Sequence, residues 1–266
     1  MRIDILTLFP EMVSGALSHS IVGRAVKAGV VDIRVHDLRQ WTTDRHRTAD
    51  DVPFGGGAGM VLKAEPLIRA ILDICDGPAT EHIERILLCP QGDVLTQATV
   101  THLASQSRIL LVCGHYEGID ERVRTLMVDR QVSVGDFVVS GGELPALILA
   151  DVIVRLLPGA LGSPESAVDE SHTDGLLEYP QFTRPAIVNG HEVPPVLRSG
   201  DHKAVAAWRR TQSIFRTRER RPDLYARWWV ASQVLRSMQA RPVAKQNKRG
   251  RARPKANLPG GTITGQ

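Results

Sequence analysis

The 266-residue sequence contains only three cysteines, Cys75, Cys89 and Cys113, and no two of them have Cys-x-x-Cys spacing. An odd number of cysteines argues against a disulfide framework, and the missing pair spacing argues against a zinc site. Free thiols persist in a reducing compartment, so we expect the protein to act in the cytoplasm.

Long hydrophobic runs are missing as well. No segment approaches the roughly 20 apolar residues that a membrane-spanning helix needs. The first ten residues, MRIDILTLFP, contain a short apolar run that Asp4 and Pro10 limit, so they lack the longer apolar region of a signal peptide. The sequence therefore predicts no membrane partner.

The familiar phosphate-binding signatures are also absent. The loop PFGGGAGM at 53–60 does not end in the Gly-Lys-Ser/Thr of a P-loop, and Met60 stands where Gly-x-Gly-x-x-Gly needs its last glycine. The loop also follows a polar segment and not a strand. These absences argue against a P-loop NTPase and against a dinucleotide-binding Rossmann enzyme.

Charge is distributed unevenly along the chain, although the net charge is only +4. Residues 1–200 contain 17 Lys and Arg against 26 Asp and Glu, whereas residues 201–266 contain 16 against 3. Such a basic region is typical of a surface that binds a polyanion, most simply a nucleic acid. A basic surface that contacts only solvent is the alternative.

The hydrophobic pattern predicts an α/β protein with a mostly parallel sheet. Short apolar, β-prone runs alternate with helical patterns as far as about residue 160. Residues 109–113 form a continuous apolar run, which favours a central strand covered on both faces, and residues 133–139 are expected to form another strand. From Glu143 onwards, ELPALILADVIVRLL predicts a long helix that ends at Pro158 and Gly159.

The composition changes after residue 160. Residues 161–176 are small and polar with Gly and Pro interruptions, as in a flexible interdomain linker. Two helices are expected after the N-cap residues Asp201 and Asp223, with facing apolar stripes in a small helical domain at 177–244. Residues 245–266 form a basic tail without aromatics, expected to be disordered. The two stripes are Val205, Trp208 and Phe215, and Leu224, Trp228, Ala231, Leu235 and Met238.

Three glycine-rich loops are candidates for a ligand site, at residues 53–60, 114–122 and 135–145. The second and third follow predicted strands, and ligands of parallel sheets gather at such strand ends. Glycine lets the backbone approach a flat ring or a carboxylate, and a neighbouring Glu can contact an amine or a cationic sulfonium. Each glycine alone could serve only turn geometry, but together the loops predict a ligand pocket.

Six motifs, in this order, resemble those of bacterial tRNA (guanine-N1) methyltransferases: DILTLFPEM, DDVPFGGGAGM, GHYEGIDERV, VSVGDFVVSGGELPAL, GLLEYPQFTRP and VPPVLRSGDH. The resemblance extends from near residue 1 to about residue 240. It implies the SPOUT class, in which part of an α/β domain is threaded into a trefoil knot, followed here by a small helical domain. Composition and spacing do not predict a knot, because chains rarely thread through loops.

The resemblance also implies a function. It implies a homodimer that transfers a methyl group from S-adenosyl-L-methionine to N1 of the guanine immediately 3′ of the anticodon in tRNA, which maintains the reading frame. Residues 1–160 would bind the methyl donor and catalyse the transfer, and residues 177–244 would bind tRNA. It further implies an active site shared between the cofactor of one subunit and the C-terminal domain of the other.

The family's cofactor pocket can be carried over position by position, with mostly backbone contacts to S-adenosyl-L-methionine. Phe137 stands where the family often has Tyr, so stacking is retained and a hydroxyl is lost. The pocket residues that the resemblance implies are Leu87, Leu88, Pro90, Gly114, Tyr116, Glu117, Gly118, Ser133, Val134, Gly135, Phe137, Val139, Gly141, Gly142 and Pro145.

The resemblance assigns the chemistry to Arg155 and to an acidic linker residue. N1 of guanine must lose its proton before its lone pair can attack in line, and Arg155 would stabilise the negative charge that develops on the base. Many relatives have Glu-Asp-Ser where this sequence has Asp169, Glu170 and Ser171. Glu170 therefore matches the usual base, with Asp169 as the alternative, although acidic residues in a polar linker are usually only solvated.

The sequence marks no metal site. His115 and His172 have no second ligand at helical or hairpin spacing, so we expect them to be surface or hydrogen-bonding residues. The resemblance suggests that Mg²⁺ assists the reaction, but no acidic cluster marks where it would bind. Cys89 and Cys113 are expected to be small buried hydrophobes.

Two rival functions remain open. One is a different knotted RNA methyltransferase, acting on a ribose 2′-hydroxyl or on a base of rRNA. The other is a non-catalytic RNA-binding protein, for which the basic helical region alone would suffice. The second rival leaves the glycine loops, Arg155 and the linker carboxylates without a role.

Overall fold

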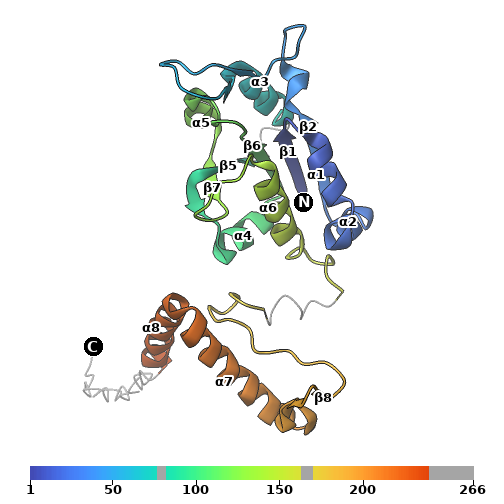
Figure 1. The fold of residues 1–266 in the computed structure, drawn as a ribbon, viewed down its shortest axis with the longest axis vertical. Helices are drawn as coiled ribbons and strands as arrows, with labels where there is room; N and C mark the ends of the chain where they lie inside the picture. The colour runs from blue at the N-terminus through green and yellow to red at the C-terminus, as the bar shows by residue number, and fades with distance from the viewer. Residues whose placement is uncertain (77–81, 163–169, 240–266) are drawn as a thin grey trace, which may run out of the picture.

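A five-stranded parallel sheet forms the centre of the N-terminal part of the protein (Figure 1). The computed structural model describes residues 1–76, 82–162 and 170–239. The strands are β1 (Arg2–Thr7), β2 (Asp32–Asp37), β5 (Ile83–Val94), β6 (Arg108–Cys113) and β7 (Arg130–Ser133). Their order is β2-β1-β6-β5-β7, and every neighbouring pair is parallel.

Helices cover both faces of this sheet, as expected for parallel strands joined by crossovers. On one face lie α1 (Pro10–Leu17), α2 (Ser20–Lys27), α4 (Gln97–Ala104) and α6 (Glu143–Val154). On the other face lie the short 3-10 helix η1 (Leu38–Trp41), α3 (Ala64–Ile74) and α5 (Glu121–Met127). A small antiparallel pair, β3 (Asp50–Asp51) and β4 (Val61–Leu62), flanks the second face.

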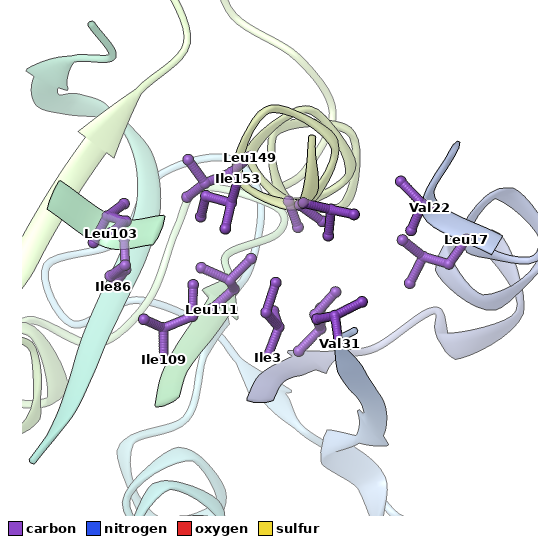
Figure 2. Close-up of a cluster of buried hydrophobic side chains, with 14 of the residues drawn as sticks. Ile3, Leu17, Val22, Val31, Ile86, Leu103, Ile109, Leu111, Leu149 and Ile153 are labelled. Carbon is purple, nitrogen blue, oxygen red and sulfur yellow. The ribbon is translucent and has the colours of Figure 1, made fainter. Parts of the chain in front are cut away.

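Strand β6 lies in the middle of the sheet, and all six of its residues are buried. Its side chains alternate: Ile109 and Leu111 belong to the core under α6, whereas Leu110 belongs to the core on the opposite face. Figure 2 shows Leu149 and Ile153 of α6 lying over Ile109 and Leu111. The prediction of a central strand at 109–113 is confirmed.

A buried ion cluster joins the three strands β1, β2 and β6. Asp4 is completely buried, and its carboxylate accepts hydrogen bonds from Arg2 (2.8 Å) and Arg108 (2.9 Å) and pairs with His36 (2.8 Å). Burial raises the pKa of the Asp4 carboxyl, but the hydrogen bonds from His36, Arg2 and Arg108 outweigh it, so the pKa lies below its ordinary value.

One predicted strand and one predicted helix end in this part of the chain are wrong. The strand expected at 133–139 does not form: β7 shares only Ser133 with it, and Gly135, with a φ of 151°, belongs to the loop that follows. The helix expected to reach Pro158 ends at Val154 instead, with Arg155 as its C-cap. Turns occupy the residues between Arg155 and Pro158.

Two long helices dominate the C-terminal part, α7 (His202–Arg220) and α8 (Pro222–Gln239) (Figure 1). Asp201 caps α7 as predicted, since its carboxylate accepts from the backbone N–H groups of Lys203 and Ala204, both at 3.0 Å. Helix α8 begins at Pro222, so Asp223 lies inside its first turn and the expected N-cap is wrong. A hairpin, β8 (Ile187–Val188) with β9 (His191–Glu192), and the 3-10 helix η3 (Pro195–Arg198) precede α7.

The expected facing apolar stripes are wrong in part. Phe215 on α7 and Leu235 on α8 are both 59% exposed. The buried positions of α7 are instead Ser213 and Thr217, because Thr217 accepts a hydrogen bond at 2.8 Å from the backbone N–H of Leu177. The segment that follows Glu170 therefore packs against part of the α7 face that was expected to contact α8.

Some predictions concern residues outside the described ranges. Asp169 and residues 163–168 of the linker fall there, as do residues 240–244 of the predicted helical domain and the whole 245–266 tail. Within the described ranges, no helix is long and apolar enough to cross a membrane.

Candidate functional site

An open cavity of about 230 Å³ lies beside residues 87–90 of β5 and the ends of β6 and β7. Fourteen of the fifteen pocket positions predicted from the resemblance line it. Gly135 is the exception, although a side chain there would meet the ring of Phe137, 2.6 Å from a Cβ. The lining positions that were predicted are Leu87, Leu88, Pro90, Gly114, Tyr116, Glu117, Gly118, Ser133, Val134, Phe137, Val139, Gly141, Gly142 and Pro145.

Seven further residues line the same cavity and were not predicted. Most of them neighbour a predicted position, so adjacency in the sequence was a usable signal. Arg124 is different, because it reaches the cavity from α5, and its guanidinium donates to the side chains of Gln91 (2.8 Å) and Gln131 (2.6 Å). The unpredicted lining residues are Cys89, His115, Ile119, Arg124, Val132, Val138 and Ser140.

The loop that follows β6 is held in a tight, strained turn. Tyr116 has a φ of 59°, in the left-handed region, which costs a non-glycine residue roughly 1–2 kcal/mol. Gly118 closes the turn by donating its N–H to the His115 carbonyl at 3.0 Å, and the Glu117 N–H donates to Met60 at 3.0 Å. Strain at a cavity wall that surrounding contacts enforce is typical of ligand-binding loops.

Gly142 is required by packing. A Cβ there would lie 2.6 Å from the Cα of Cys113, and the Gly142 N–H donates to the Gly114 carbonyl at 2.7 Å. The start of α6 therefore lies directly against the end of β6. This contact brings Pro145, in the first turn of α6, to the cavity.

The buried carboxylate of Glu143 lies next to His115, which lines the cavity. Glu143 is 2% exposed, accepts a hydrogen bond from the Thr7 hydroxyl at 2.7 Å, and lies 3.7 Å from Nδ1 of His115. Burial, and next the negative charge of Glu143, raise the pKa of the Cys113 thiol well above its ordinary value. Cys113 is therefore the small buried hydrophobe that was predicted, whereas Cys89 is only half-buried.

The first glycine loop, residues 53–60, does not line the cavity, so its predicted place in one pocket with the other two loops is wrong. Its glycine at 59 instead makes room for the Glu117 side chain, whose Oε1 would lie 2.5 Å from a Cβ there. The loop borders a separate groove of about 1040 Å³ beside α3 and carries a fully exposed Phe54.

Arg155 and Glu170 form a bidentate ion pair, with Nη1–Oε2 at 2.8 Å and Nη2–Oε1 at 2.6 Å. The hydrogen bonds to Glu170 raise the pKa of the Arg155 guanidinium, while its partial burial opposes that rise. About a third of each side chain is exposed, at 32% and 33%. The pair therefore remains accessible to a substrate.

The structure does not bring this pair to the cavity. Arg155 follows the last turn of α6, whereas Glu143 and Pro145 stand at its first turn. Twelve residues at 1.5 Å each separate Glu143 from Arg155 by about 18 Å along the helix axis. The two halves of the predicted site thus lie at opposite ends of one helix in a single chain.

No group of three or more His, Cys, Asp or Glu side chains that could hold a metal ion occurs in residues 1–76, 82–162 and 170–239. His115 contacts Phe9 and Tyr116 through its ring, with both centroids at 4.8 Å.

The sheet and its cavity define a parallel α/β protein that is covered on both faces and has a cavity at the carboxyl ends of β6 and β7. Residues 1–227 match the family model described as tRNA (Guanine-1)-methyltransferase TrmD. The chain belongs to this family, whose fold is of the SPOUT class, and the membership predicted from the six motifs is confirmed.

Curated relatives agree over most of the chain. It is 58% identical over 230 residues to the tRNA (guanine-N(1)-)-methyltransferase of Chloroflexus aurantiacus, covering 85% of this chain and 89% of that protein. It is 51% identical over 224 residues to the enzyme of the same name from Geobacillus kaustophilus, covering 84% and 91%. For the Moorella thermoacetica enzyme of that name, the identity is 49% over 227 residues, covering 85% and 91%.

Proposed function

We propose that this protein transfers a methyl group from S-adenosyl-L-methionine to N1 of the guanine immediately 3′ of the anticodon in tRNA, in the cytoplasm, and so maintains the reading frame. The relatives named as tRNA (guanine-N(1)-)-methyltransferases support the reaction. The observation that carries the proposal is the single cavity formed by fourteen of the fifteen positions expected to hold the methyl donor.

The residues that line the cavity suit S-adenosyl-L-methionine in their chemistry. Apolar side chains such as Leu87, Val132 and Pro145 offer a surface for a flat adenine ring, and Glu117 offers a carboxylate to the amino group. When bound, S-adenosyl-L-methionine supplies an electrophilic methyl group on a positively charged sulfur. The strained turn at Tyr116 keeps the wall that carries Glu117 in place before any ligand arrives.

Glu170 and Arg155 perform the acid-base part of the proposed reaction. The Glu170 carboxylate takes the proton from guanine N1, and the N1 lone pair then forms the bond to the methyl carbon as the sulfur–methyl bond breaks. The Arg155 guanidinium stabilises the negative charge that develops on the base. Their mutual ion pair must open for this, so guanine replaces Glu170 as the partner of Arg155.

The separation of about 18 Å between the two ends of α6 supports a homodimer. A methyl group transfers only between atoms in contact, so the cavity of one chain needs Arg155 and Glu170 from another. We therefore propose a symmetric dimer in which each active site combines the donor cavity of one subunit with the catalytic pair of its partner.

Each segment of the chain has one role in the proposed function. Residues 1–160 bind the donor, residues 161–176 carry the base, and residues 177–244 bind tRNA with the basic residues concentrated after residue 200. Cations paired with phosphates make RNA affinity fall with salt, and the 245–266 tail would add to this dependence.

The test is methyl transfer from labelled S-adenosyl-L-methionine to a tRNA transcript with guanine 3′ of its anticodon. A transcript with adenine at that position is the control, and the modified nucleoside is identified after digestion. Labelled 1-methylguanosine from the first transcript alone is the expected result. A 2′-O-methyl nucleoside would instead indicate a ribose methyltransferase, and calorimetry without any S-adenosyl-L-methionine binding would indicate a plain RNA-binding protein.

A further inference from the structure

A second groove, of about 420 Å³, lies in the C-terminal part of the chain and has no role in the site described above. The segment 179–186 forms one wall, and α7 forms another. The hairpin and η3 close it through Val193 and Leu197. Its volume falls in the range of roughly 300–1,000 Å³ that is usual for small-molecule sites.

An arginine and a tyrosine stack inside this groove. The Arg209 guanidinium lies over the ring of Tyr179, 4.6 Å from its centroid. Nε of Arg209 is buried and has no hydrogen-bond partner among the described residues. A buried donor without a partner is costly, so this atom is suited to an acceptor that a ligand brings.

The groove is cationic. Arg184, Arg198 and Arg209 line it, and no Asp or Glu does so among the described residues. Glu192 of the hairpin neutralises Arg198 in an ion pair, which leaves Arg184 and Arg209 to attract an anion. The neighbouring groove along α7 is different, because Glu170, Asp174 and Glu178 line it.

Aromatic rings complete the groove. Phe182 lies at its edge, 47% exposed, and its ring centroid is 6.4 Å from that of Trp208. Exposed rings beside arginines form the usual surface for unpaired nucleotides, which stack their bases on the rings and bring their phosphates to the cations. Such stacking tolerates any base, because every base has a flat face.

We propose that this groove binds one unpaired nucleotide of the tRNA that flanks the target guanine, with its base stacked on Phe182 and its phosphate near Arg184 and Arg209. The inference rests on the proposed function for the identity of the RNA. Tyr179 and Arg209 also line the neighbouring groove that contains Glu170. They therefore form a partition, with the flanking nucleotide on one side and the catalytic carboxylate on the other.

The test compares Phe182→Leu with Phe215→Leu, since Phe215 is a similarly exposed aromatic residue of α7 that does not line the groove. The affinity of each full-length variant is measured at one salt concentration for a tRNA transcript. It is then measured for a set of transcripts that each lack one base of the anticodon loop. Phe182→Leu is expected to lower the affinity for intact tRNA about tenfold, and Phe215→Leu to lower it by a much smaller factor, because Phe215 does not line the groove.

One transcript that lacks a base should abolish the difference between the parent protein and Phe182→Leu, which identifies the stacked nucleotide. Unchanged affinity in Phe182→Leu, or a loss that is equal for every transcript, would overturn the proposal. Arg209→Lys gives a second readout if Phe182→Leu fails to fold, since it keeps the charge but removes the stacked plane, and it should lower affinity with the salt dependence unchanged.

The outcomes also separate this inference from the proposed function. If the parent protein methylates tRNA and both groove variants bind it normally, only the groove assignment fails. If the parent protein binds tRNA but transfers no methyl group to it, the proposed function fails, and the binding comparison still decides whether the groove holds a nucleotide.

Discussion

The Arg155 guanidinium and the Glu170 carboxylate satisfy each other through two parallel hydrogen bonds of 2.8 and 2.6 Å. About a third of each side chain is exposed, so a guanine can reach the pair. To hydrogen-bond with either group, the guanine must separate the two side chains.

Replacing Arg155 by Ala should lower the rate of methyl transfer about 100-fold or more, because the charge on the guanine loses its stabilising cation. Binding of S-adenosyl-L-methionine, measured by calorimetry, should stay nearly the same, since Arg155 does not line the cavity that would hold the donor. Arg221→Ala is the matched control, because Arg221 forms a comparable bidentate pair with Asp223 at the start of α8. Equal loss of donor binding and transfer in Arg155→Ala would contradict the assigned role.

Glu170→Gln keeps the shape of the side chain but removes its ability to accept a proton. We expect single-turnover methyl transfer to fall by a factor of about 100–10,000, with tRNA affinity nearly unchanged. Asp169→Asn, just outside the described residues, should have little effect. The reverse pattern, with loss only in Asp169→Asn, would assign the base to Asp169.

A mixture of two inactive variants should recover activity if the active site is shared. Glu117→Ala damages the donor cavity and Glu170→Gln removes the base, so each homodimer is inactive. A mixed dimer has one site with both defects and one intact site, and an equal mixture that exchanges subunits should reach about a quarter of the parent activity. An activity that stays at the level of the separate variants would place both groups in one chain.

Gly142→Ala tests the contact between α6 and β6. Its Cβ would lie 2.6 Å from the Cα of Cys113, and forcing the two elements apart should destabilise the fold by about 1–3 kcal/mol and weaken donor binding. Gly15→Ala in α1 is the control, because nothing lies within 4 Å of its Cβ, and it should stabilise the protein by up to about 1 kcal/mol. Thermal unfolding and calorimetry measure both effects. Normal donor binding in a stable Gly142→Ala variant would show that the contact is dispensable.

The buried cluster around Asp4 predicts how stability changes with pH. The pKa of Asp4 is below its ordinary value of 3.8 in the folded protein, so its contribution is fully present above about that pH. This stability is lost as the pH falls through the lower folded-state value. Asp4→Asn leaves Arg108 and its neighbours without the buried negative charge, which should cost about 3 kcal/mol or more at neutral pH.

Denaturant unfolding between neutral and acidic pH measures this effect. The Asp4→Asn variant should lose less stability than the parent protein on acidification, because the titrating group is gone. Asp223→Asn is the control, as that carboxylate is exposed, and its removal should change stability little. A parallel pH dependence in Asp4→Asn and the parent protein would contradict the assignment.

Short sequence patterns correctly predicted the strand and the helix start that neighbouring residues determine. The run at 109–113 has no polar residue, which only a strand covered on both faces tolerates, and Asp201 stands where a helix needs an acceptor. The apolar residues after Ser133 were wrongly predicted to form a strand, for a physical reason. Valines suit a strand and a cavity wall equally well, and the φ of Gly135 decides between the two.

Features that depend on distant contacts could not be predicted in this way. Arg124 reaches the cavity only because α5 packs beside β5 and β7, and Thr217 is buried only because Leu177 donates to it. The separation of the two half-sites, in contrast, follows from the helix predicted from Glu143 onwards, which contains both Pro145 and Arg155. The pairing of Arg155 with Glu170 is a distant contact that no local pattern predicts.

The strand order also determines when each strand can pair with its neighbour as the chain is synthesised. Strand β1 pairs with β6 from Arg2↔Arg108 onwards, so the first strand leaves the ribosome long before its central neighbour exists. Translation at about 5–20 residues per second leaves that apolar strand waiting for several seconds. Pro145 lines the cavity as well, so a nascent chain that ends before α6 lacks one wall of the cavity and the helix that covers Ile109 and Leu111.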